Sequence, residues 1–288
     1  MHELAVGLPM LVAFASGLGA RGRLQRHFRV LFCAHFAAGV GLIGFLAGWS
    51  FHLTVDNLLA LAVLLAAQLS AVGAAGRLFR RRADSAPLAF AMYGNPGLWA
   101  LPVATATLGP AAAVLIATYD TLTQARIALG IRLLRRRAPR PQTARTALTD
   151  YAPPLAALAG LAFGRAIPAP AQTPAAVAVA GVTSAVIGAH LLGVAWPDRW
   201  LAPEQLRVSA RALALHFTLA PAVLLLTALA GLHLPAPVWL VVFSPLPASL
   251  VSFSRLYGYS IRLAATALTV SAGASAALLP AVLAVLPP

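Results

Sequence analysis

The chain of 288 residues has few charged side chains, a single cysteine and no lysine. Only 10% of its residues are charged and 60% are hydrophobic, whereas an average soluble domain has about 25% charged residues. This composition excludes an ordinary soluble domain and predicts an integral membrane protein. The lone cysteine, Cys33, excludes a disulfide framework and a thiolate metal site.

Sequence motifs of the common enzyme classes are also missing. The chain has no His-Glu-x-x-His pair, no Gly-rich phosphate loop with its lysine, and no recognisable Ser/His/Asp arrangement. We therefore predict that the protein is not an enzyme and needs no resident cofactor.

All 21 basic residues are arginines, and the formal net charge is +14. They lie in short loops between apolar stretches, without interleaved aromatic side chains, which argues against a nucleic-acid surface. Usage of arginine without lysine, in an alanine-rich chain, is typical of a GC-rich bacterial genome. The sequence thus predicts a protein of the bacterial inner (plasma) membrane, with no nucleic-acid partner.

Ten apolar stretches are long enough to cross a bilayer, which takes about 17–25 residues. They cover residues 4–20, 28–50, 56–76, 86–108, 110–131, 151–166, 173–195, 208–230, 236–254 and 261–286. No basic residue precedes the first stretch and four arginines follow it, which is the reverse of a signal peptide. We expect ten transmembrane helices.

Loops rich in arginine alternate along the chain with loops that have few or no arginines. All but Arg126 and Arg165 fall at the five loops that follow odd-numbered stretches. Because basic loops stay in the cytoplasm, both termini are expected outside. Five helices per half give an inverted 5+5 repeat, with residues 1–131 as the first repeat, 132–149 as a basic cytoplasmic loop and 150–288 as the second repeat.

Two helix-breaking segments interrupt corresponding stretches, the fourth and the ninth. They are Tyr93-Gly94-Asn95-Pro96-Gly97 and Phe243-Ser244-Pro245-Leu246-Pro247. Interrupted helices are tolerated in a membrane only inside protein or beside a cavity, and paired ones indicate the substrate site of an inverted-repeat transporter. The alternative is that each proline merely kinks a continuous helix.

The residues at each interruption favour an anion site. Asn95 and Ser244 are good N-cap residues, and Pro96 and Pro245 suit the first helical position. Each pair therefore predicts the start of a half-helix whose free N–H groups and positive dipole end favour a carboxylate. Gly94 and Gly97 allow the close approach and the backbone angles that a helix break needs.

Asp120 is the only acidic residue well inside a predicted span, where a charge costs about 2.5–3.5 kcal/mol. Gln124 shares its helical face, and Thr121 lies beside it. Asp120 is predicted to couple transport to an ion, either as a proton carrier or as a sodium ligand with Thr121 and Asn95. The structural alternative, an ion pair with Arg126, places the two side chains on different faces.

The segment from Asn95 to Pro102, running on to Gly109, resembles the fourth-helix signature of the auxin efflux carrier (AEC) family of transporters. Similar features are Asp150-Tyr151-Ala152-Pro153-Pro154-Leu155 followed by Gly160, then Pro247, Ser254-Arg255-Leu256-Tyr257-Gly258 and Leu279-Pro280. The second interruption departs from the family pattern, because it lacks an asparagine.

The resemblance implies ten helices with crossed broken helices 4 and 9, in which a core (helices 3–5 and 8–10) moves against a scaffold (helices 1, 2, 6 and 7). It implies organic-anion substrates such as malate, malonate or auxin-type acids, and sodium near the crossover in the related bile-acid symporter fold. Gln68 and His216 would then face the core and join the substrate-binding residues.

The predicted function is therefore a secondary carrier of a small organic anion, working by alternating access. A passive anion channel and a non-transporting receptor or scaffold with the same fold are the alternatives. The motifs Gly44-x-x-x-Gly48 and Gly160-x-x-x-Gly164 allow close helix approach. They permit a homodimer through scaffold helices, although packing within one chain is the expected use.

Overall fold

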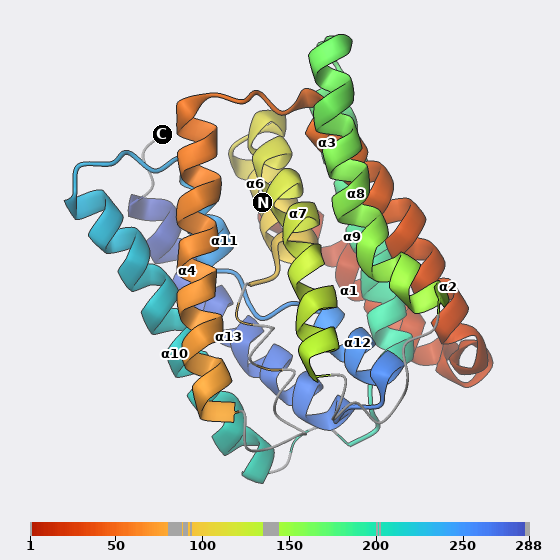
Figure 1. The fold of residues 1–288 in the computed structure, drawn as a ribbon. Helices are drawn as coiled ribbons and strands as arrows, with labels where there is room; N and C mark the ends of the chain where they lie inside the picture. The colour runs from red at the N-terminus through yellow and green to blue at the C-terminus, as the bar shows by residue number, and fades with distance from the viewer. Residues whose placement is uncertain are drawn as a thin grey trace. The chain divides into compact units, whose positions relative to one another are not determined.

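The computed structural model describes residues 2–79, 88, 92, 94–134, 144–199, 201 and 203–285, and every regular element in these ranges is helical (Figure 1). Within these ranges, five helical stretches are long and apolar enough to cross a membrane: Gly7–Ser50, Val55–Phe79, Thr173–Ala195, Pro203–Leu229 and Ile261–Ala284. The predicted all-helical class is confirmed, and the long apolar helices are compatible with a membrane protein.

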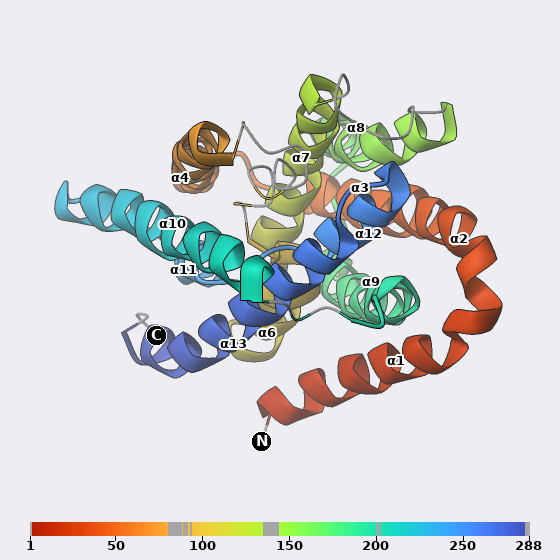
Figure 2. The same ribbon diagram turned by 90° about the horizontal axis from the view of Figure 1, so that it is seen from below.

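The first of these stretches is 44 residues long, more than a single span requires. A single 3₁₀ turn, η1 (Gln25–His27), separates α1 (His2–Leu24) from α2 (Phe28–Ala34), and Figure 2 shows the chain bending there. This bend lies between the first two predicted spans. Arg21 and Arg23 occupy the last turn of α1, where they also complement the helix dipole.

The helices form two compact units that alternate along the sequence. The first unit takes the described residues of 1–52, 96–136 and 140–196, and the second takes those of 53–95 and 197–288. The chain passes from one unit to the other between Asn95 and Pro96, inside the first predicted interruption.

In the first unit, α1, η1 and α2 continue into a π-helical segment and further helices. These are η2 (His35–Val40), α3 (Gly41–Ser50), η4 (Pro96–Ala100), α6 (Leu101–Thr107), α7 (Pro110–Leu134), α8 (Ala144–Ala166) and α9 (Thr173–Ala195). Gly109, with φ of +87°, ends α6 and separates it from α7. In the second unit the helices are α4 (Val55–Phe79), α10 (Pro203–Leu229), α11 (Ala236–Val242), α12 (Ser249–Tyr257) and α13 (Ile261–Val285), and α10 packs against both α4 and α13.

Two glycine motifs bring α3 and α8 into direct backbone contact. A Cβ atom on Gly48 would lie 2.2 Å from the carbonyl oxygen of Ala157, and one on Gly160 would lie 2.1 Å from that of Phe45. Any side chain at either position would force the helices apart. The two small-residue motifs therefore pack against each other inside one chain, as expected.

Helices α1 and α9 make the same kind of contact. A Cβ on Gly17 would lie 2.0 Å from the carbonyl oxygen of His190, and one on Gly193 would lie 2.2 Å from that of Phe14. In both helix pairs, each glycine faces the carbonyl three residues before the glycine of the partner helix. The first unit thus contains two helix pairs with the same contact geometry.

Candidate functional site

The first interruption ends where Pro96 starts a new helical run. η4 begins at Pro96 and continues directly into α6, so the predicted helix start is confirmed. Proline suits this position because the first residues of a helix need no N–H donor. η4 is a π-helical turn, a form often found at functional sites. Tyr93 of the same motif lies outside the described residues.

Gly94 is required by its backbone conformation and by its neighbours. Its φ is +79°, in the left-handed region that favours glycine. A Cβ there would lie 2.3 Å from the Ser244 Oγ and 2.7 Å from the Val241 carbonyl oxygen. The first interruption therefore rests directly on the second within the second unit.

We expect Gly94→Ala to destabilise the second unit, by about 1–3 kcal/mol for the strained backbone alone. The displaced Ser244 hydroxyl adds to this cost. A lower thermal midpoint of the detergent-purified variant would show the effect. The matched control is Gly273→Ala in α13, where a Cβ meets nothing within 4 Å, and equal midpoints for the two variants would contradict the prediction.

The second interruption is longer than the sequence pattern predicts. α11 ends at Val242 and α12 begins only at Ser249, so the prediction that a half-helix starts directly after Ser244 is wrong. The residue before a proline is disfavoured in the helical conformation. Leu246 precedes Pro247, and this second proline delays the helix by a further turn.

Side chains replace the helical hydrogen bonds that are lost at this interruption. The Ser244 hydroxyl donates to the Val241 carbonyl (2.6 Å) and accepts from the Asn95 N–H (2.8 Å). His216 on α10 has its Nε2 2.9 Å from the Ser244 carbonyl oxygen. Since a carbonyl only accepts, Nε2 carries the proton in this contact.

A further serine that the sequence analysis did not single out completes the arrangement. The Leu246 N–H donates to the Ser271 Oγ (3.0 Å). The Ser271 hydroxyl in turn donates to the Leu268 carbonyl oxygen (2.8 Å). The only sequence feature that pointed to Ser271 was its place in a final helix rich in alanine, serine and threonine. Ser244, Ser271 and His216 are at most 1% exposed.

This network reduces the donors that the second interruption can offer to an anion. Pro245 and Pro247 have no N–H, and the Leu246 N–H is bonded to Ser271. The Ser244 hydroxyl is thus used in hydrogen bonds within and between the two interruptions, and His216 Nε2 is bonded to the Ser244 carbonyl. Gln68, another predicted substrate-binding residue, is 3% exposed on α4 in the same unit.

In the first unit, Asp120 lies against the start of the helical run at Pro96. A Cβ on Gly97 would lie 2.6 Å from the Asp120 Oδ2, so only glycine leaves room for the carboxylate. Gln124 donates from Nε2 to the Asp120 Oδ1 (3.1 Å), which confirms that the two side chains share a helical face. A carboxylate near the first turn of a helix is stabilised by the helix dipole.

Thr121 does not share this environment. Its hydroxyl donates to the Ala117 carbonyl (2.7 Å), and a Cβ on Gly44 of α3 would lie 3.1 Å from its methyl carbon. Its side chain therefore points to α3, whereas Asp120 faces Gly97. The side chain of Arg126 lies outside the described residues.

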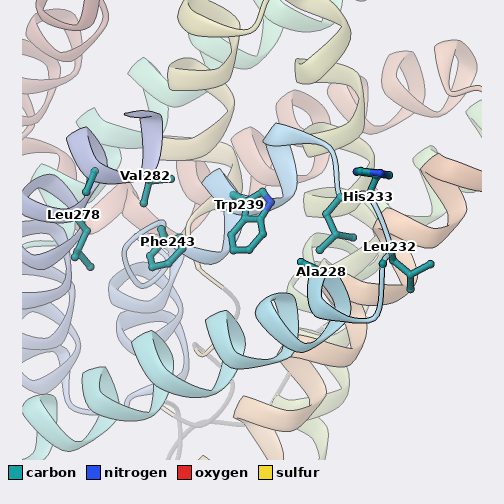
Figure 3. A pocket seen from close by; sticks show the side chains of 10 residues that line it. Ala228, Leu232, His233, Trp239, Phe243, Leu278 and Val282 are labelled. Carbon is teal, nitrogen blue, oxygen red and sulfur yellow. The ribbon is translucent and has the colours of Figure 1, made fainter. Parts of the chain in front are cut away.

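An apolar pocket of about 550 Å³ adjoins the second interruption (Figure 3). Its wall includes Phe243, the residue before Ser244, and Trp239 from α11. The rest is formed by Ala228, Gly231, Leu232, His233, Leu234, Leu278, Ala281 and Val282. Pockets of this size and character commonly hold the apolar part of a small organic ligand.

No model of a known protein family matches the sequence, and no curated protein matches it. The fold and site therefore define its class: a helical protein, throughout its described residues, with five helical stretches long enough to cross a membrane.

Proposed function

We propose that the protein is a secondary transporter of a small organic anion, with ten helices in an inverted 5+5 repeat and alternating access at the interrupted helices. One observation carries this proposal. The Asn95 N–H and the Ser244 Oγ, 149 residues apart in sequence, are hydrogen-bonded at 2.8 Å, so the two interruptions meet. Paired, interrupted helices that meet are typical of transporter substrate sites.

The two glycine contacts support the inverted repeat. Under a 5+5 repeat, α1 corresponds to α8 and α3 corresponds to α9. The contact between α1 and α9 then has the contact between α8 and α3 as its counterpart in the repeat. Gly17 with Gly193, and Gly160 with Gly48, follow this exchange with matching contact geometry.

The proposed anion site uses the Asn95 side chain and the first helical turn after Pro96, where Gly97 leaves room for the Asp120 carboxylate. Asp120 is the proposed coupling residue, because its carboxylate lies at this same turn and is held by Gln124. A carboxylate there competes with a substrate anion for the helix terminus unless a proton or a sodium ion neutralises it. Coupling to one of these cations follows from that competition.

The apolar pocket belongs to the second unit, where it adjoins the second interruption. Phe243 and Trp239 offer aromatic surfaces next to the interruption. Malate, malonate and auxin-type acids are the proposed substrates. The bacterial inner membrane, both termini outside and a homodimer through scaffold helices belong to the same proposal. Because the two glycine motifs cover each other, such a dimer would use other scaffold residues.

Uptake into proteoliposomes tests the proposed function. Labelled malate, malonate and an aromatic acid are supplied under a sodium gradient, a proton gradient or neither. We expect concentrative uptake of at least one of these acids under one of the two gradients. Absence of uptake by folded protein would favour the receptor alternative, and fast uptake that no gradient concentrates would favour a passive anion channel.

A further inference from the structure

The second interruption leaves backbone groups without helical partners between Val242 and Ser249. In a membrane each such group needs a replacement partner, since no water is present to supply one. The replacements come from two other helices: His216 of α10 for the Ser244 carbonyl, and Ser271 of α13 for the Leu246 N–H.

Ser244 connects these contacts to the first interruption. Its hydroxyl has one donor and an acceptor oxygen, and both are used, toward Val241 and toward the N–H of Asn95. The main chain of Ser244 is in turn held by His216. Movement of the Ser244 backbone therefore disturbs the Asn95 contact.

Burial makes these bonds strongly interdependent. Ser244 and Ser271 are fully buried, His216 is 1% exposed and Asn95 is 8% exposed. Hydrogen bonds in such a low-dielectric environment are stronger than in water, and leaving one partner unsatisfied is costly.

We infer that His216 and Ser271 are positioning residues. They fix the non-helical backbone of the second interruption and, through the Ser244 hydroxyl, its contact with the first interruption. His216 then serves the substrate site by fixing the backbone and does not bind the anion itself. The two interruptions respond to the loss of either contact as one connected element.

Amide hydrogen exchange of the full-length protein in lipid nanodiscs tests this directly. Because Pro245 and Pro247 carry no amide, residues 244–248 report only on Ser244, Leu246 and Ala248. We expect Ser271→Ala to speed exchange at Leu246 by about 10- to 100-fold, as for a lost buried hydrogen bond. Both Ser271→Ala and His216→Ala are expected to speed exchange at Asn95 as well, because Ser244 connects the two interruptions.

Ser275→Ala is the matched control. Ser275 lies one turn further along α13 and is fully buried, but its hydroxyl has no hydrogen-bond partner among the described residues. This variant is expected to leave exchange at Leu246 and Asn95 unchanged. Equal exchange in Ser271→Ala and Ser275→Ala, or an unchanged Asn95 amide in His216→Ala, would overturn the inference.

Conservative variants keep the test valid if an alanine variant fails to fold. Ser271→Thr retains the hydroxyl and His216→Gln retains an N–H donor, so both are expected to keep exchange at Leu246 and Asn95 near the wild-type rates. Faster exchange in both would contradict the assigned contacts.

A second experiment measures uptake and rests on the proposed function. It distinguishes a positioning role of Ser271 from a general effect on protein stability. Ser271→Ala is expected to raise the KM for the transported acid several-fold, while Ser275→Ala leaves it unchanged. Absence of uptake by the wild type would defeat the proposed function alone, since the exchange measurements do not depend on transport.

Discussion

Gly48→Ala is expected to remove most of the folded protein. The added Cβ would lie 2.2 Å from the carbonyl oxygen of Ala157 and 3.0 Å from the backbone nitrogen of Leu161. Both neighbours are backbone atoms of α8, so no side chain can turn aside and the helices must separate. Overpacking of this kind costs about 1–3 kcal/mol, and backbone contacts place this substitution at the upper end.

Fluorescence-detected size-exclusion chromatography after a temperature series measures the effect. Gly73→Ala is the matched control, since it is also a glycine within an apolar helix and a Cβ there meets nothing within 4 Å. Alanine is favoured over glycine in helices by about 1 kcal/mol, so the control is expected to be neutral or slightly stabilising. Equal stability of the two variants would show that α3 and α8 do not pack in this register.

Gly193→Ala extends the same prediction to the second helix pair. Its Cβ would lie 2.2 Å from the Phe14 carbonyl oxygen and 2.9 Å from the Leu18 nitrogen. If the pairs are related by the proposed repeat, Gly193→Ala is expected to lose about as much stability as Gly48→Ala.

Asn95→Ala is expected to abolish substrate flux while leaving the folded yield nearly intact. The contact with Ser244 uses the main-chain N–H of Asn95, which alanine retains, so the two interruptions stay joined. Only the side-chain amide, the proposed ligand of the substrate carboxylate, is lost. Uptake of the transported acid into proteoliposomes, normalised to folded protein, measures the change.

Asn57→Ala provides the control for this substitution. Asn57 is the other asparagine of the chain and lies in the first turn of α4, outside both interruptions. It is expected to transport at the wild-type rate. Wild-type flux in Asn95→Ala would move the substrate site away from the first interruption.

Local features of the chain were predictable because they depend on neighbours in sequence. Pro96 starts a helical run, a position where its missing N–H costs no hydrogen bond, and Gln124 reaches Asp120 because residues four apart share a helical face. The start of α12 was predicted too early, although Pro247 carried the signal: its effect on Leu246 is equally local.

The partners of the interrupted backbone could not be derived in the same way. His216 and Ser271 reach Ser244 and Leu246 only because α10 and α13 are rotated to present those faces. No sequence feature distinguishes Ser271 from Ser275 one turn later, yet the Ser271 hydroxyl has hydrogen-bond partners and the Ser275 hydroxyl has none among the described residues. Likewise, the Thr121 side chain points to α3 and not to the surroundings of Asp120, because the missing side chain of Gly44 leaves room for the Thr121 methyl group.

The sequence by itself determined the apolar helical class and the helix start at Pro96, because these follow from hydropathy and proline at short range. Tertiary structure decided which helices use the glycine contacts, where the carboxylate of Asp120 lies and which side chains satisfy the broken backbone. These depend on helix rotation and close packing between segments more than 20 residues apart, which no local pattern encodes.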